Sequence, residues 1–424
     1  MTIAVASPSL APRSGGVTLG QVQTLAVWLM LATSFFVKIE PAICDALFVL
    51  VLVLHITSGI ALNKSVIPMI TYLFFYNFGA FLSSLQLVGD QNIVTMFIVT
   101  STYMATTAIF FAFYVAYDPL PRLAVIKNAW IVAATIASIL GLLGYFNIAG
   151  LGGALSFNQR AVATFKDPNV FATFLIFPCL LILQGFLLGT QRNRFFSAIA
   201  LLLILAAIFL AFSRGAWISF VSASILIVGF SFILAPSNKL RSRIIILSVI
   251  GLIVTAIMLL LLLSIDDVRN LFLDRFTLVK NYDAGETGRF GNQLNSIPML
   301  LERPLGFGPL QFFKYFGLDP HNTFINSFAS YGWLGGFSYF LLIFSTIYIG
   351  LKTVLTHTPW QNHAIVVFCP LLTTILQGVQ IDTDHWRHFY VLLGLMWGLF
   401  AASALPMLSH NAMPIEKNKL DLWG

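Results

Sequence analysis

Residues 195–234 read FFSAIALLLILAAIFLAFSRGAWISFVSASILIVGFSFIL, and this stretch decides the fold class. Only Ser213-Arg214-Gly215 interrupts roughly 40 apolar residues, and a helix needs about 20 of them to cross the hydrocarbon core of a bilayer. The length therefore predicts two membrane spans joined by a very tight turn.

The composition of the whole chain agrees with this stretch. The 424 residues are 58% hydrophobic and 9% charged, whereas soluble domains carry about 25% charged residues. Too little polar surface is left to cover a soluble globule, so we expect an all-α integral membrane protein. The net charge of +7 does not indicate a nucleic-acid partner, because basic residues of membrane proteins gather in cytoplasmic loops.

Apolar runs along the chain predict about twelve membrane spans. The predicted spans are 21–37, 42–62, 66–87, 92–116, 124–147, 169–188, 195–213, 215–235, 244–264, 326–350, 362–380 and 388–405. The short loops on one side then hold most of the basic residues: Lys64, Arg122, Lys127, Arg192, Arg194, Lys239, Arg241, Arg243, Lys352, Lys417 and Lys419. The positive-inside rule makes this side cytoplasmic, together with both tails, 1–20 and 406–424.

The opposite side carries the one long loop, residues 265–325, which separates spans nine and ten. Long loops cross a membrane largely regardless of their charge, so the mixed basic and acidic residues of this loop fit the outer side. Its apolar residues predict short amphipathic helices.

Arg214 lies at the tight turn, which this topology places at the outer surface. An Arg near the membrane is costly unless it is paired, hydrated or snorkelling. A snorkelling Arg at a turn is one interpretation. The other is an anion clamp, because the planar guanidinium suits phosphate oxygens.

Residues 164–172, TFKDPNVFA, start a span at the same surface. Asp167 suits the N-cap and Pro168 the first helical position, so capping alone explains the pattern. An exposed helix N-terminus also favours a nearby anion. Arg160 and Lys166 precede this helix start and Asn169 follows it, so they are possible supporting residues.

Arg289 lies in the long loop, within residues 288–292, GRFGN. Alone this is a weak signal, since loop arginines are usually solvated. Residues 302–309, ERPLGFGP, follow it, and their two glycines predict a tight turn. They form no nucleotide-binding loop, because neither GxGxxG nor a Walker pattern is present.

The strongest candidate is residues 320–326, PHNTFIN, followed by YGWLGG at 331–336. His321 enters a span at the outer surface, where an imidazole can act as a base near neutral pH. A structural hydrogen bond at the interface is the alternative.

Residues 382–388, DTDHWRH, lie on the same side. Asp382 and Asp384, beside histidines, could bind a metal or orient a base. They could equally belong to a solvated turn.

In this order and topology, the motifs resemble those of the O-antigen ligase and polymerase superfamily, membrane glycosyltransferases that use a lipid carrier. The resemblance covers residues 160–340. Its matching features are Asp167-Pro168-Asn169, Ser213-Arg214-Gly215, a long outer loop with Arg289, the turn at 304–308, and His321-Asn322 ahead of Gly332 and Gly335.

The resemblance implies an enzyme of the bacterial inner membrane with a periplasmic active site. The donor would be a glycan on undecaprenyl pyrophosphate, and the acceptor a hydroxyl of lipid A–core in a ligase or of another glycan in a polymerase. By position, His321 looks like the base, and Arg214 and Arg289 look like pyrophosphate ligands. Asn322, Asp382 and Asp384 join the possible supporting residues, and no metal, nucleotide or other cofactor is required.

One departure concerns Ser330, since many members have an acidic residue there. The surrounding sequence is more similar to members linked to exopolysaccharide production, so ligase and polymerase both stay open. A transporter of lipid-linked glycans is the main rival from another class. Transporters often show internal repeats and charged or broken helices near mid-membrane. Here the charged spans are few and no repeat is visible. A purely structural membrane protein would leave the polar motifs of one face unexplained.

Overall fold

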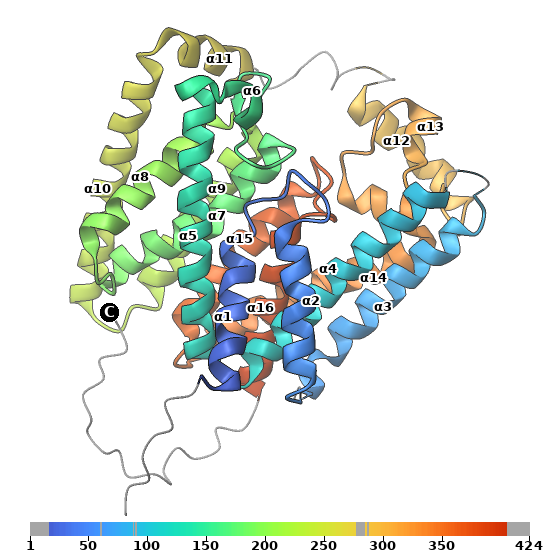
Figure 1. Cartoon of the computed structure of the whole chain (residues 1–424), viewed down its shortest axis with the longest axis horizontal. Helices are drawn as coiled ribbons and strands as arrows, with labels where there is room; N and C mark the ends of the chain where they lie inside the picture. The colour runs from blue at the N-terminus through green and yellow to red at the C-terminus, as the bar shows by residue number, and fades with distance from the viewer. Residues whose placement is uncertain are drawn as a thin grey trace, which may run out of the picture.

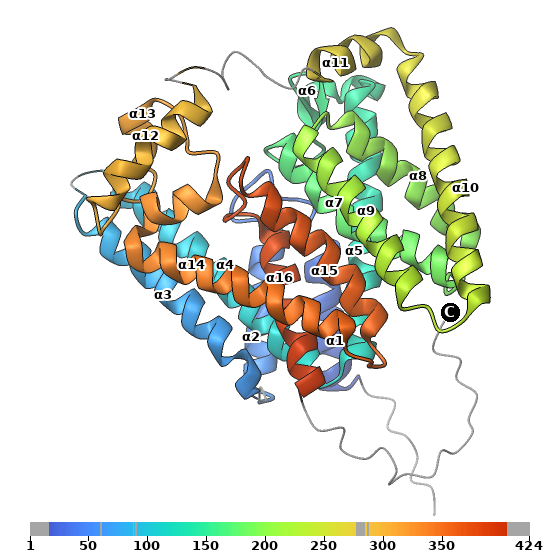
Figure 2. The same cartoon turned by 180° about the vertical axis from the view of Figure 1, so that it is seen from behind.

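The structure, a computed structural model, describes residues 17–59, 62–87, 89, 91–276, 285 and 288–404. Within these ranges the chain is almost entirely α-helical, as predicted (Figures 1 and 2). Most of the predicted N-terminal tail and the whole C-terminal tail, with Lys417 and Lys419, lie outside the described residues.

Each predicted span contains one main helix. These helices are α1 (Leu19–Ala32), α2 (Ile43–Ile56), α3 (Ile67–Ser84), α4 (Gln91–Ala116), α5 (Pro119–Tyr145), α7 (Pro168–Leu188), α8 (Arg194–Leu210), α9 (Arg214–Ile233), α10 (Asn238–Leu263), α14 (Thr323–Leu355), α15 (Gln361–Gln377) and α16 (Arg387–Ala404).

Seven helices in the described part of the chain are long and apolar enough to cross a membrane. They are α4, α5, α7, α9, α10, α14, and α3 together with the preceding 3-10 turn η1 (Lys64–Val66). The shortest of the others, α1 and α2, have 14 residues each. At about 1.5 Å per residue such a helix is roughly 21 Å long, short of the ~30 Å hydrocarbon core. The count of twelve spans therefore stays a prediction.

The connecting segments contain smaller elements. After α5 come η2 (Ile148–Gly150), α6 (Gly152–Leu155) and an antiparallel ribbon of β1 (Ser156–Phe157) and β2 (Arg160–Ala161). The long loop contains α11 (Asp266–Phe276), α12 (Arg289–Leu301) and α13 (Phe312–Phe316), so short helices are present where the sequence predicts them. The ribbon was not expected, because strands of two residues leave no periodic pattern.

The helices form two groups around a central set. Figure 1 shows α5 and α7–α10 on one side and α3, α4 and α12–α14 on the other, and Figure 2 agrees from behind. α1, α15 and α16 lie between them. Two glycines allow α16 to approach α4 closely, since a Cβ at Gly394 would lie 2.3 Å from the carbonyl oxygen of Ala108 and one at Gly398 2.6 Å from that of Ala112.

The connections gather at two ends of the bundle. We call the end that holds residues 33–42, 146–167, 211–213, 302–322 and 378–386 the site end. The end that holds residues 57–66, 189–193, 234–237 and 356–360 is the far end. Contacts such as Val37 N to Thr164 O at the site end and Asn63 Nδ2 to Ala401 O at the far end hold each set together. Successive connections between these helices lie alternately at the two ends, as the predicted topology requires. The side of the membrane that each end faces stays a prediction.

A kink in α14 shapes the site end. Gly332 interrupts the helix at φ 65° and ψ −173°, and the turn at 304–308 docks into the break. Trp333 N donates to Pro304 O at 2.8 Å, and a Cβ at Gly332 would lie 2.7 Å from the same oxygen. The turn itself uses two glycines at positive φ, Gly306 and Gly308, as the sequence predicts. The kink therefore fixes the first part of α14, which begins two residues after His321.

Candidate functional site

Residues 377–382, at the end of α15, form the meeting point of the site end. Segments that are far apart in the sequence contact this short stretch: the start of α9, the start of α12 and the turn before α14. Those three segments carry Arg214, Arg289 and His321, respectively. The structure thus brings the three residues to one end of the bundle and to one segment.

His321 is held by its backbone. The N–H groups of His321 and Asn322 donate to the two carboxylate oxygens of Asp382, at 3.1 and 3.0 Å. From α12, the Gln293 side chain donates to Pro320 O at 2.8 Å. His321 has a φ of 46°, in the left-handed region that non-glycine residues seldom adopt. The carboxylate and the amide hold this turn in place, so the imidazole leaves the chain in a fixed direction.

Asn322 caps the helix that follows. Its Oδ1 accepts from the N–H groups of Phe324 and Ile325 at 3.0 and 3.2 Å, a normal N-cap arrangement. One residue further, Thr323 N donates to Gly378 O at 2.7 Å, which ties the helix start to the end of α15. Asn322 therefore positions His321 through the backbone.

Arg289 begins α12 and is half-buried. Its Nη1 donates to Gln380 O at 3.3 Å, and its guanidinium carbon lies 4.8 Å from the centre of the Phe290 ring. The contact with Gln380 places this cation two residues from Asp382, the residue that holds His321.

Arg214 begins α9, where the Ser213 hydroxyl caps the helix by accepting from Ala216 N at 3.3 Å. The tight turn is thus present as expected. The next residue packs on α15, since a Cβ at Gly215 would lie 3.1 Å from Nε2 of Gln377. Gln377 is buried and accepts from the hydroxyls of Ser219 and Thr173 at 3.1 and 3.3 Å. The backbone of Arg214 therefore lies where the start of α9 packs against the end of α15.

Arg160 lies beside the same turn. Its Nε donates to Ala211 O at 2.7 Å, and its Nη2 donates to the side-chain oxygen of Asn169 at 3.0 Å. Asp167 caps α7 by accepting from Asn169 N at 2.5 Å. These contacts join the ribbon, the end of α8 and the start of α7, so Arg160, Asp167 and Asn169 have clear structural roles next to Arg214.

Lys166 belongs to a different cluster. It pairs with Glu40 at 2.8 Å, Glu40 also lies 3.7 Å from Arg387, and Arg387 makes a two-pronged contact with Asp45 at 2.8 and 2.9 Å. These four residues, which we call the charged rim, come from the loop after α1 and the starts of α2, α7 and α16. Lys166 is therefore separate from the three residues that meet at 377–382.

Asp384 is buried, with 1% of its surface exposed. Its Oδ2 accepts from the Asn326 side chain at 3.0 Å and lies 3.3 Å from Nδ1 of His385. The solvated turn considered from the sequence is wrong for this residue. As for the alternative of a metal, the described residues contain no group of three His, Cys, Asp or Glu side chains placed to hold an ion.

The pKa of the Asp382 carboxyl lies above its ordinary value. Burial is the largest cause that raises the pKa of Asp382, and the neighbouring Asp384 carboxylate adds to it. The two N–H groups that donate to Asp382 act in the opposite direction, because they stabilise the charged form. Asp382 therefore takes up a proton at higher pH than an ordinary aspartate.

Sequence reasoning missed several residues of this end. Gln293 and Gln377 are buried connectors, and Glu40, Asp45 and Arg387 complete the charged rim. A signal was available, because polar and charged side chains next to or inside apolar runs are costly and usually have partners. The identity of those partners depends on how the helices pack.

The comparisons with known proteins bear on the same region. Residues 199–340 match the family model described as O-antigen ligase. No curated protein matches the chain. The matched segment includes Arg214, Arg289 and His321, whereas the start of α7 and the loop between α15 and α16 lie outside it. The resemblance to the O-antigen ligase and polymerase superfamily that the motifs predict is thereby confirmed over residues 199–340, about a third of the chain.

Proposed function

We propose that this protein transfers a glycan from undecaprenyl pyrophosphate to an acceptor hydroxyl at the periplasmic face of the bacterial inner membrane, with both termini in the cytoplasm. The family indicates a membrane glycosyltransferase-like enzyme. The observation that carries the finer proposal is the convergence of Arg214, Arg289 and His321 on residues 377–382 at the site end.

The chemistry needs a base on one side of the anomeric carbon and cations on the other. In the proposed step, the acceptor oxygen forms a bond to the anomeric carbon while the bond from that carbon to the phosphate oxygen breaks. The acceptor proton goes to the imidazole of His321. The leaving lipid pyrophosphate keeps the electron pair, and Arg214 and Arg289 stabilise its developing charge through their planar guanidinium groups.

Asp382 acts as a positioning residue in this scheme. It accepts from two backbone N–H groups at the His321 turn and so keeps the imidazole aimed in one direction. Preorganisation of this kind matters, because small displacements of a catalytic group reduce the rate steeply. The scheme requires neither a nucleotide sugar nor a metal ion.

The test is a transfer assay with purified protein in lipid nanodiscs. A lipid-pyrophosphate glycan serves as donor, without metal or ATP, and either lipid A–core or a second lipid-linked repeat unit serves as acceptor. We expect a new glycosidic bond in the wild type and its loss in His321→Ala and Arg214→Ala. Transfer to lipid A–core identifies a ligase, and transfer to the repeat unit identifies an O-antigen or exopolysaccharide polymerase. A wild type that forms no bond but moves the lipid across vesicles would refute the proposal in favour of a transporter.

A further inference from the structure

Helix α12 of the long loop exposes its apolar side chains and buries its polar ones. Asn292, Gln293 and Ser296 are buried on one face. The large apolar residues of the other face are exposed: Phe290 at 47%, Leu294 at 68%, Ile297 at 44% and Leu301 at 67%. A surface helix of a soluble protein has the opposite arrangement, with its apolar face on the core. The exposed face of α12 therefore needs an apolar partner outside the chain.

The four exposed residues form a continuous line, which we call the apolar stripe. Their spacing of four, three and four positions keeps them within an arc of about 60° on an α-helix. The polar face is tied to the protein, since Asn292 Nδ2 donates to Phe316 O at 3.1 Å and Gln293 Nε2 donates to Pro320 O at 2.8 Å. These bonds fix the rotation of α12 about its axis, so the stripe points outward along the whole helix.

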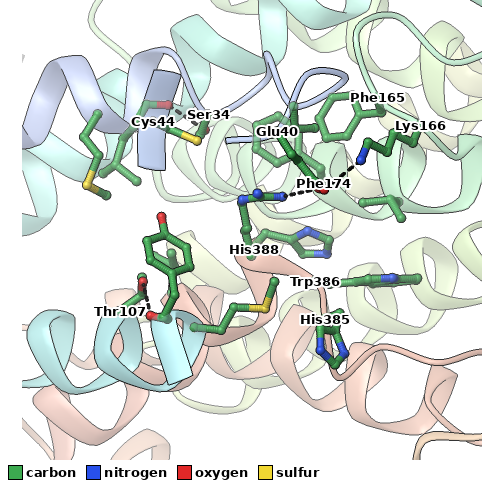
Figure 3. Close-up of a pocket in the computed structure, with 18 of the residues that line it drawn as sticks. Ser34, Glu40, Cys44, Thr107, Phe165, Lys166, Phe174, His385, Trp386 and His388 are labelled. Carbon is green, nitrogen blue, oxygen red and sulfur yellow. Dashed lines mark hydrogen bonds and ion pairs between the residues drawn. The ribbon is translucent and has the colours of Figure 1, made fainter. Parts of the chain in front are cut away.

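Apolar side chains elsewhere at the site end face inward. A cavity of about 210 Å³ lies between α1, α4, α5, α7 and α16. Figure 3 shows Phe165 and Phe174 at its wall, with Lys166 directed at Glu40 beside them. The stripe of α12 differs from this internal surface, because it is large, apolar and open to the surroundings.

Helix α14 indicates where the bilayer begins at this end. Every residue from Thr323 to Gly332 is buried or half-buried. Beyond the kink, exposed large apolar residues recur every three or four positions: Trp333, Phe337, Leu341, Phe344 and Tyr348. Residues 333–355 span roughly 34 Å at about 1.5 Å per residue, close to the ~30 Å hydrocarbon core. Tryptophan is enriched at the membrane–water boundary, so Trp333 marks that boundary at the site end.

Trp333 also joins α12 to the lipid-facing surface of α14. Its Nε1 donates to Leu300 O and its backbone N to Pro304 O, both at 2.8 Å. The last turn of α12, with Leu301, therefore lies at the boundary, and the stripe continues the surface that α14 presents to lipid. Figures 1 and 2 show α12 and α13 together at the edge of the molecule.

Basic and aromatic side chains follow the stripe in the chain. The exposed ones are Arg303, Phe313, Lys314 and Tyr315. Arg303 Nη1 donates to the Tyr315 hydroxyl at 2.9 Å, so a cation and a ring lie together. Aromatic rings and cations of this kind favour the headgroup region of a bilayer, where the lipid phosphates are.

We propose that the apolar stripe docks α12 into the lipid leaflet at the site end, with the stripe among the acyl chains and Arg303 and Lys314 among the headgroups. Because the stripe runs the length of the helix, the axis of α12 lies along the membrane surface. Arg289, the first residue of α12, is then held at the level of the lipid phosphates. This consequence for the donor rests on the proposed function, whereas the docking does not.

A spin label measures the depth of the stripe without donor or acceptor. Leu294→Cys carries a nitroxide in nanodiscs of phosphatidylethanolamine and phosphatidylglycerol, one protein per disc. The native cysteines are buried and should stay unlabelled: Cys44, Cys179 and Cys369. Oxygen concentrates among acyl chains and a charged nickel complex stays in water, so oxygen should relax this label more than the nickel complex does.

The matched control is Glu302→Cys, at the exposed C-cap of the same helix and off the stripe. The nickel complex should relax that label more than oxygen does. If a label on Leu294→Cys disturbs the fold, Ile297→Cys reports on the stripe one turn further along.

Two outcomes overturn the docking. One is a stripe label that the nickel complex reaches as easily as it reaches Glu302→Cys, which would leave the stripe in water. The other, measured with two proteins per disc, is a stripe label shielded from both agents, which would assign the stripe to a second copy of the chain.

Kinetics separate the docking from the proposed function. In the transfer assay, Leu294→Asn should raise the KM for the lipid-linked donor about tenfold, since an apolar side chain is lost from the acyl region, while the KM for the acceptor changes less than about twofold. An unchanged donor KM would overturn the link to Arg289. A lipid-exposed stripe in a protein that forms no glycosidic bond refutes the proposed function and leaves the docking standing. Transfer by a protein whose stripe lies in water refutes the docking alone.

Discussion

The two ends of the helical bundle are both polar, but their polar groups do different things. At the far end they donate to carbonyl oxygens of helices: Arg243 donates to Phe186 O at 3.2 Å near the end of α7, and Gln184 donates to Asn362 O at 2.7 Å in the first turn of α15. At the site end, carboxylates and amides join loops from distant parts of the chain, as Asp382 does for the His321 turn.

This difference between the two ends indicates which of them can hold catalytic side chains. A cation on a helix C-terminus satisfies carbonyl groups that the helix leaves over, and that role is structural. A loop that a carboxylate fixes through two backbone N–H groups instead holds side chains in set directions. Matched substitutions at the two ends should therefore have unequal effects.

The largest effect is expected for His321→Ala. Removing the proposed base should lower the rate of glycan transfer by ~10²–10⁴-fold, the usual contribution of a general base. His363→Ala, at the far end, should stay close to the wild-type rate. Single-turnover measurements at saturating donor and acceptor check this, and equal rates for both variants would remove the distinction between the ends.

The second-largest effect on activity is expected for Arg289→Lys. Lysine keeps the charge but loses the planar fork that contacts two phosphate oxygens at once, so we expect a fall in kcat/KM for the donor of about tenfold or more. The matched far-end variant is Arg243→Lys, whose kinetics should be unchanged. Wild-type activity in Arg289→Lys would take this residue out of the site.

The charged rim should matter for stability. Asp45→Asn removes the two-pronged acceptor of the half-buried Arg387, and we expect a loss of about 1–3 kcal/mol in the free energy of unfolding. The control is Asp266→Asn, which removes an exposed pair with Arg269 and should cost less than about 1 kcal/mol. Thermal unfolding in nanodiscs compares the two, and equal losses would show that the rim is no more than a surface pair.

The smallest effect is a pH dependence. The fold raises the pKa of Asp382, so the folded state favours the protonated carboxyl. The stability that this gives is fully present below the unfolded pKa of about 3.9. It is lost as the pH rises through the raised pKa of the folded state. Asp382→Asn cannot ionise. The wild type should therefore lose thermal stability relative to this variant between about pH 4 and neutrality. A relative gain would mean that the two N–H donors outweigh burial and lower the pKa.

The sequence predicts helices well and their depth poorly. Every predicted span contains a helix, yet α2 ends at Ile56, well before residue 62. Mean hydropathy does not indicate burial either. The most apolar 18 residues of α10 have a mean hydropathy of 3.1, and 6% of them are buried inside the protein. Those of α7 have a lower mean hydropathy of 2.3, yet 83% of them are buried. Lipid and protein interior are equally apolar, so the composition of a helix does not tell which of the two surrounds it.

The residues of the candidate site could be predicted from the sequence, but most of the contacts that hold them could not. Motif order alone selected Arg214, Arg289 and His321, and the structure places all three at one end. The contact of Arg387 with Asp45 joins residues 342 positions apart, and nothing local in the sequence predicts it. Gln377 looked like one more residue near the end of an apolar run, although its side chain connects α7, α9 and α15. Such contacts follow from packing, which a single sequence does not show.

The most direct test of the proposed glycan transfer is the ratio of released lipid pyrophosphate to new glycosidic bonds. The purified protein receives a lipid-pyrophosphate glycan and an acceptor, without metal or nucleotide, and the released lipid pyrophosphate is counted against new glycosidic bonds. We expect one released carrier for each bond in the wild type, and neither product above background in His321→Ala. Bond formation that persists in His321→Ala, or carrier release that does not match the bonds formed, would contradict it.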